Sequence, residues 1–156
     1  MLPPKLIMSP IDFSHPSAEA LNVAADMATR FSSELLLVYV VPAIPKLPSS
    51  VSMFKEGEYE EAMHKDAAQH LEEMAKKLTQ KGVRARTQVG TANDVGMELV
   101  RIAAHEKVDL IVIATHGMTG WRRLTFGSVT EKVVRAADCP VLVLRAEATE
   151  KAAIAM

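Results

Sequence analysis

The stretch 108–129, VDLIVIATHGMTGWRRLTFGSV, constrains the fold more than any other part of this chain. It begins with an unbroken apolar run, Leu110–Ala114, which is typical of a parallel strand covered by helices on both faces. Residues 115–120 follow as a loop, in which Gly117 and Gly120 permit a positive φ and a close backbone approach to a ligand. The sequence therefore predicts a buried strand that leads into a glycine loop.

A helix is expected after this loop. Gly127 precedes Ser128 and Glu131, which have the S-x-x-E spacing of a capping box. One face of the predicted helix carries small and branched apolar residues, namely Val129, Val133, Val134 and Ala137. Free amide N–H groups and the positive end of a helix dipole would meet at the carboxyl end of the strand, where phosphate is favoured. A phosphate site is the first hypothesis, although such loops and caps also occur in proteins that bind nothing.

Known nucleotide motifs narrow this hypothesis. The chain contains no G-x-x-x-x-G-K-[ST] and no G-x-G-x-x-G, so neither a Walker P-loop nor the dinucleotide fingerprint is present. The run from Ala114 through Gly117, followed after nine residues by Gly127 and Ser128, resembles the G-x-x-G-(nine residues)-G-[ST] motif of the universal stress proteins. IMSPIDFS at 7–14 and CPVLVLR at 139–145 are similar to the first and last strands of that family. The resemblance covers residues 5–145.

The resemblance implies a function and a site. Members of this nucleotide-binding subgroup bind ATP or AMP, with Mg²⁺ as an expected companion of ATP. By analogy, Asp12 would contact the nucleoside and Val40 would contact adenine through its main chain. The implied nucleotide site comprises Pro10, Ile11, Asp12, Val40, Ala114, His116, Gly117, Gly127, Ser128 and Val129. No catalytic residue and no metal ligand is expected.

Two departures from the family pattern concern the phosphate end of this site. Ala114 stands where the motif has its first glycine, and its methyl group is tolerable only if φ stays negative. Met118 occupies a position that is often basic in relatives, so charge neutralisation would fall to Arg122 and Arg123, which could equally be solvated. His116 could donate to a phosphate or simply pack over the loop, and no neighbouring carboxylate orients it as a base.

Composition excludes several other classes of protein. With 156 residues the chain is expected to form one domain, with its core in 5–145 and a frayed tail at 146–156. The 18 basic and 19 acidic side chains leave a net charge of −1, so neither nucleic acid nor an anionic membrane is an expected partner. Cys139 is alone and precedes an apolar strand, which indicates a buried packing residue in a reducing compartment. No leader or membrane span is visible, and a cytoplasmic location is expected.

The first half of the chain alternates strands and helices. A strand is predicted at Lys5–Pro10, followed by a helix that starts at Ser14 and Pro16 and runs to about Phe31. Asp12 lies between them and, by sequence alone, could be no more than a helix-start acid. Leu35–Val41 is a second buried strand that ends at Pro42. Residues 42–57 are predicted to be a long loop, either a flap over a ligand or a disordered excursion.

The second half continues this alternation. A helix is predicted at Glu58–Lys81, where His64 and His70 lie too far apart around the axis to share a metal. The alternating stretch Val83–Val89 predicts an edge strand that ends at Gly90. Asn93 is predicted to cap the next helix, which would continue to Lys107 with Val95, Leu99, Ile102 and Ala103 facing inward.

Together these elements predict an α/β fold with a five-stranded parallel sheet between two helical layers and right-handed crossovers. The family resemblance implies a three-layer, Rossmann-like sandwich of the adenine nucleotide alpha hydrolase-like type. It also implies the strand order 3-2-1-4-5, with the nucleotide at the switch point. The apolar strand Val141–Leu144 would then lie at an edge, where pairing with a second copy would make a homodimer.

Three functions follow as expectations. A nucleotide-responsive stress or signalling module agrees with both the resemblance and the predicted phosphate site. A weak ATPase or phosphotransferase would need a positioned nucleophile and a metal-binding acid, and Asp12 is the only candidate for the acid. A dimeric scaffold without a ligand is the third, and only Ala114 supports it.

Overall fold

The computed structural model describes residues 3–43, 56–115 and 127–145. Along these residues strands and helices alternate, as predicted. The elements are β1 (Leu6–Pro10), α1 (His15–Phe31), β2 (Glu34–Pro42), α2 (Glu56–Gln80), β3 (Arg84–Ala92), α3 (Val95–His105), β4 (Leu110–Thr115), α4 (Ser128–Ala136) and β5 (Val141–Arg145). The predicted flap or excursion at 42–57 and the tail at 146–156 lie mostly or wholly outside the described residues.

The strands form one parallel sheet in the order β3-β2-β1-β4-β5, which confirms the predicted fold class and strand order. β1 is central and pairs with β2 over five residues, but with β4 over only two, Ile7↔Leu110 and Met8↔Ile111. Beyond Met8 the two strands no longer pair. The sheet therefore opens at the carboxyl end of β1, where the order of the strands reverses.

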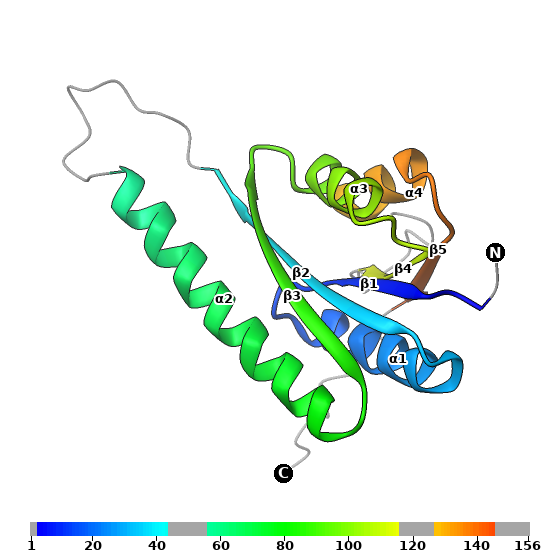
Figure 1. The fold of residues 1–156 in the computed structure, drawn as a ribbon. Coiled ribbons are helices and arrows are strands. Elements are labelled where there is room, and N and C mark those ends of the chain that lie inside the picture. Colours follow the sequence, from blue (N-terminus) through cyan, green and yellow to red (C-terminus); the bar gives the residue numbers. More distant parts are fainter. Residues whose placement is uncertain (1–2, 44–55, 116–126, 146–156) are drawn as a thin grey trace, which may run out of the picture.

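Helices cover both faces of the sheet (Figure 1). α1 and α2 pack on one face over a cluster that includes Ile7, Leu35 and Leu71, whereas α3 and α4 pack on the other over Met8, Ile111 and Val133. Because Ile7 and Met8 are adjacent and fully buried, β1 contributes to both cores. This explains the continuous apolar runs in the sequence of the central strands.

The structure corrects the predicted end of one strand, the predicted caps of two helices and one predicted buried position. β3 continues past Gly90 to Ala92, because its pairing with β2 continues to Pro42↔Ala92. Asp94, not Asn93, caps α3, since its Oδ1 accepts a hydrogen bond of 3.1 Å from Met97 N. α4 begins with Gly127 as N-cap and Ser128 as its first helical residue, so the Ser128 capping box does not form. On the same helix Val134 is 42% exposed, in place of the predicted core position.

The long helix α2 also differs in part from its predicted apolar stripe. Ala67, Leu71 and Leu78 are buried against the sheet, but Tyr59 is 56% exposed. In Figure 1 the N-terminal end of α2 stands away from the strands, whereas its C-terminal end lies close to β3. None of the described helices is both long and apolar enough to cross a bilayer.

Candidate functional site

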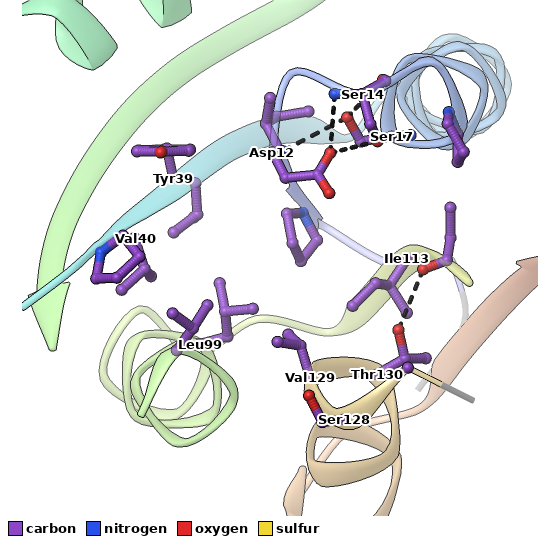
Figure 2. A pocket seen from close by; sticks show the side chains of 18 residues that line it. Asp12, Ser14, Ser17, Tyr39, Val40, Leu99, Ile113, Ser128, Val129 and Thr130 are labelled. Atoms are coloured by element: carbon purple, nitrogen blue, oxygen red, sulfur yellow. Dashed lines mark hydrogen bonds between the residues drawn. The ribbon is translucent and has the colours of Figure 1, made fainter. Parts of the chain in front are cut away.

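A pocket of about 360 Å³ lies at the carboxyl end of the sheet, where β1 and β4 separate (Figure 2). The ends of β1, β2 and β4 and the first turns of α1, α3 and α4 form its wall. The lining residues are Pro10, Ile11, Asp12, Ser14, Pro16, Ser17, Val38, Tyr39, Val40, Pro42, Val95, Leu99, Ile113, Ala114, Gly127, Ser128, Val129 and Thr130. Segments that are far apart in the sequence thus meet at the switch point of the sheet.

Most of the predicted site residues lie around this pocket. They are Pro10, Ile11, Asp12, Val40, Ala114, Gly127, Ser128 and Val129. His116 and Gly117 lie outside the described residues, as do Met118, Arg122 and Arg123. Contact of any of these residues with a nucleotide stays a prediction, but the pocket brings the described ones together.

One end of the pocket can read a planar base. Val38, Val40 and Leu99 are buried and supply an apolar surface. Val38 O accepts from Ile11 N at 2.8 Å, which shows that the backbone of Val38 faces β1. In a parallel strand every second residue faces the same neighbour, so the N–H and C=O of Val40 point to the same side. β1 has already ended there, because its last pair is Pro10↔Val38, and the Val40 backbone groups are therefore directed into the pocket.

The loop between β1 and α1 carries the acid of the pocket. Asp12 Oδ1 accepts a hydrogen bond of 2.9 Å from Ser14 N and a second one from the Ser14 hydroxyl. Ser14 is the N-cap of α1, and its Oγ accepts from Ser17 N at 3.3 Å. Ser17 Oγ in turn donates to Ser14 O at 3.0 Å. Asp12 thus contacts the N-cap of α1 and also lines the pocket, and its contact with a nucleoside stays a prediction.

Phe13 allows the sharp turn after Asp12. Its φ of 62° is left-handed, an uncommon conformation for a bulky residue. Its ring lies 5.0 Å from the Tyr39 ring and 5.6 Å from the His70 ring, measured between centroids. His70 therefore contacts Phe13 on one side, although its side chain stays half exposed. These contacts support the loop that carries Asp12.

The third part of the pocket is the first turn of α4. Gly127 gives this helix no side-chain cap, whereas Ser14 caps α1 and Asp94 caps α3. The amide groups at the start of α4 are consequently left for another acceptor, which favours an anion. Among the lining residues in the described part of the chain, Asp12 is the only charged side chain, so none of these residues is basic.

Sequence reasoning missed several residues of this pocket, above all Ser17 and Thr130. Both are buried hydroxyl residues in the first turns of α1 and α4. Thr130 Oγ1 donates to the carbonyl of Ala114 at 3.1 Å (Figure 2). A hydroxyl residue three positions into a helix that follows a predicted ligand loop is the signal that could have identified each of them.

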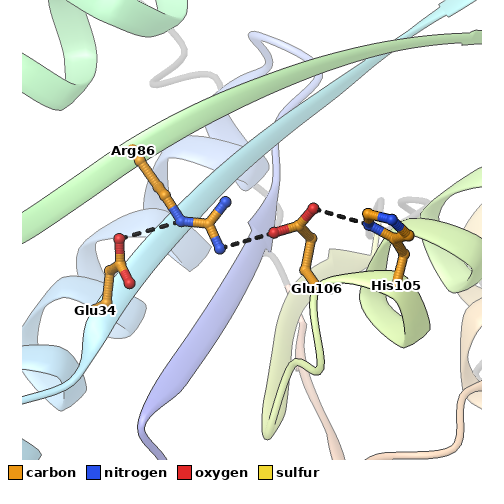
Figure 3. A network of polar contacts seen from close by, with 4 residues as sticks. All are labelled: Glu34, Arg86, His105 and Glu106. Carbon is orange, nitrogen blue, oxygen red and sulfur yellow. Dashed lines mark hydrogen bonds and ion pairs between the residues drawn. The ribbon is translucent and has the colours of Figure 1, made fainter.

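A second polar cluster lies away from the pocket, near the amino ends of β2 and β3 (Figure 3). Arg86 Nε contacts Glu34 Oε1 at 3.1 Å, and Arg86 Nη2 contacts Glu106 Oε2 at 3.0 Å. Hydrogen bonds from His105 and Arg86 lower the pKa of Glu106. The guanidinium thus joins two strands to the end of α3, which is a structural role. The described residues contain no group of three His, Cys, Asp or Glu that could hold a metal ion.

Known proteins share this fold and this sequence pattern. The universal stress protein MJ0531 of Methanocaldococcus jannaschii is 35% identical over 144 residues, which cover 90% of this chain and 82% of that protein. The solved structure of MJ0577 from the same organism has a TM-score of 0.76 at 30% identity, covering 93% of this chain and 98% of that one. The universal stress protein from Archaeoglobus fulgidus in complex with dAMP has the same fold, with a TM-score of 0.59, 17% identity and coverage of 92% and 98%.

The family comparison agrees with these relatives. The model of the universal stress protein family matches residues 4–145, and this range contains every residue of the described pocket. The chain therefore belongs to the universal stress protein family.

Proposed function

We propose that this universal stress protein binds an adenine nucleotide, ATP or AMP, in the pocket at the carboxyl end of the sheet. The observation that carries the proposal is the convergence on one pocket of the Val40 backbone, the Asp12 carboxylate and the uncapped start of α4. The Val40 backbone has the groups to bind a base, the Asp12 carboxylate can bind a ribose, and the start of α4 can bind a phosphate. The relative from A. fulgidus, whose structure contains dAMP, supports the choice of an adenine nucleotide.

The backbone of Val40 supports adenine over guanine. Its N–H can donate to adenine N1, and its C=O can accept from the adenine N6 amino group. Guanine presents the opposite pattern at these positions, a donor at N1 and an acceptor at O6, and would leave both backbone groups unsatisfied. The buried Val38 and Leu99 side chains would pack on the faces of the ring.

The proposed role is that of a module whose state depends on nucleotide occupancy, in the cytoplasm and as a homodimer. Mg²⁺ would accompany ATP through the phosphate oxygens, since this ion binds chiefly through phosphates and water. His116 and Gly117 are predicted to belong to the phosphate end, and their placement lies outside the described residues.

Calorimetric titration of the purified protein with ATP, ADP, AMP, adenosine and GTP, each with and without Mg²⁺, tests this proposal. We expect ATP or AMP to bind with a micromolar Kd and GTP to bind at least about tenfold more weakly, because a single unmatched polar pair already costs about that much and guanine leaves both Val40 groups unmatched. Analysis of the nucleotides after incubation separates binding from hydrolysis. Equal binding of ATP and GTP would contradict the base assignment, and no binding of any nucleotide would contradict the function.

A further inference from the structure

Thr130 forms a direct link between the end of β4 and the first turn of α4. Its side chain is only 4% exposed, and its Oγ1 donates to the carbonyl oxygen of Ala114 at 3.1 Å (Figure 2). Ala114 and Thr130 both line the pocket, on either side of the segment 116–126. The hydrogen bond therefore fixes the relative position of two pocket walls that are separated in the sequence.

The Ala114 carbonyl needs this donor because of its place in the sheet. Ile111 N donates to Pro140 O, so the backbone of Ile111 faces β5. Backbone direction alternates along a strand, and Ala114, three residues later, must face the side of β1. The pairing of β4 with β1 ends at Met8↔Ile111, so β1 cannot supply the donor. The Thr130 hydroxyl satisfies a carbonyl that would otherwise present its negative end to the pocket.

α4 has few other attachments to the sheet. Its buried residues are Thr130 and Val133, and its N-cap, Gly127, makes no side-chain hydrogen bond. Val133 lies one turn further from the pocket, so Thr130 is the buried residue nearest to the start of the helix. The Thr130 hydrogen bond is thus a direct side-chain link from the first turn of α4 to the sheet, in addition to the packing of α4 against α3.

We propose that Thr130 is a positioning residue for the phosphate end of the nucleotide site, an inference that rests on the function proposed above. Its hydroxyl holds the first turn of α4 at a fixed place beside the end of β4. By donating to the Ala114 carbonyl oxygen, the hydroxyl also reduces the electrostatic repulsion between this oxygen and the phosphates. The residue therefore determines how much more tightly a phosphorylated nucleotide binds than adenosine.

The comparison of Thr130→Val with Thr130→Ser in the full chain tests this role. Valine keeps the branched shape but has no hydroxyl, whereas serine keeps the hydroxyl. We expect Thr130→Val to weaken ATP or AMP binding about fivefold, the effect of one neutral hydrogen bond, and to leave adenosine binding unchanged. Thr130→Ser should retain the wild-type ratio of ATP to adenosine affinity. Circular dichroism and thermal unfolding check the fold, and Thr130→Ala replaces the valine variant if that variant does not fold.

Each outcome of the calorimetric titrations decides a different point. If wild type and Thr130→Val bind ATP equally, the positioning role is wrong while the proposed nucleotide function stands. If Thr130→Val weakens adenosine as much as ATP, or if Thr130→Ser behaves like the valine variant, Thr130 acts only through the general packing of the pocket. If the wild-type protein binds no adenine nucleotide, the proposed function fails and this inference fails with it.

Discussion

At the scale of single residues, Asp12 combines a structural contact with an exposed position on the pocket. Its Oδ1 accepts from the backbone and the hydroxyl of Ser14, which is the N-cap of α1. An acid that holds a cap has a fixed carboxylate, and a fixed carboxylate binds a ribose hydroxyl at a lower entropic cost than a mobile one. The structural role therefore supports the proposed binding role.

The pair Asp12→Asn and Asp12→Ala separates these two roles. Asparagine retains an oxygen that can accept from Ser14 but has no charge, whereas alanine retains neither. We expect both variants to weaken ATP and adenosine by similar factors, about tenfold, because a charged hydrogen bond to the nucleoside is lost. Only Asp12→Ala should also lower the free energy of unfolding, by about 1 kcal/mol, because the support of the α1 cap is lost. Calorimetry and thermal unfolding measure the two effects, and a loss confined to ATP would place Asp12 at the phosphates or at a metal ion.

Sequence reasoning located the strands and helices that build the pocket, because apolar runs and turn residues mark them directly, but it placed the caps of α3 and α4 one residue away from Asp94 and Gly127. The direction of the Val40 backbone depends on where β1 stops pairing with β2, which is a property of the register and not of the residue itself. Thr130 was not identified because the S-x-x-E spacing indicated a cap at Ser128, whereas Gly127 occupies that position. The position of Thr130 in the first turn of the helix is visible in the sequence, but its partner, the Ala114 carbonyl, is not, because that contact depends on how two distant segments pack.

At the scale of whole elements, the contact between α3 and α4 sets the width of the pocket. A Cβ atom at Gly96 would lie 2.9 Å from Lys132 Cβ and 3.2 Å from Val129 O, so only glycine allows the helices to approach this closely. The approach brings Lys132 Nζ to 2.6 Å from Asp94 Oδ2. Asp94 also caps α3 through Met97 N. One carboxylate thus holds the start of α3 and joins it to α4.

This arrangement predicts a pH-dependent contribution to stability. The hydrogen bond from Lys132 and that from Met97 N lower the pKa of Asp94 below its ordinary value of 3.8. A carboxyl group whose pKa is lower in the folded state stabilises the fold above its unfolded-state pKa, and this contribution is lost as the pH falls through the folded-state pKa. Asp94→Asn keeps a side chain that can cap the helix but loses the ion pair.

We expect Asp94→Asn to have a slightly lower Tm than the wild type near neutral pH, and the difference to disappear as the pH falls through the lowered pKa of Asp94, where Asp94 itself becomes protonated. The effect is small because the pair is exposed to solvent. Thermal unfolding of both proteins across this pH range measures it, with Glu131→Gln, which removes an ion pair within α4, as the control. A Tm difference that stays constant with pH would show that the carboxylate charge is not the cause.

At the scale of the whole molecule, the two edges of the sheet differ. β3 is an outer strand whose exposed face carries polar residues, and α2 covers its other face. β5 is the opposite outer strand, with four half-buried apolar residues followed by the exposed Arg145. Val143 packs toward the cluster under α3 and α4, and Leu144 packs toward the cluster under α1, so the side chains of β5 serve this chain's own cores. The backbone of β5 is what remains for a partner, since no strand of the described residues pairs with its outer side.

The predicted homodimer would use this backbone edge. Pro140 O accepts from Ile111 N, so the backbone N–H and C=O groups of residues 140, 142 and 144 point to β4. The backbone groups of Val143 point to the open edge of the sheet. Val143→Pro removes the N–H that points away from β4, and it leaves the hydrogen bonds between β4 and β5 intact. A proline is tolerated at such a position of an edge strand. We expect the wild type to sediment as a dimer at micromolar concentration and Val143→Pro to sediment as a folded monomer. Val143→Ala is the matched control, because it shortens the side chain but keeps the N–H, and it should remain dimeric. A monomeric wild type, or a proline variant that still forms the dimer, would exclude β5 pairing as the basis of assembly.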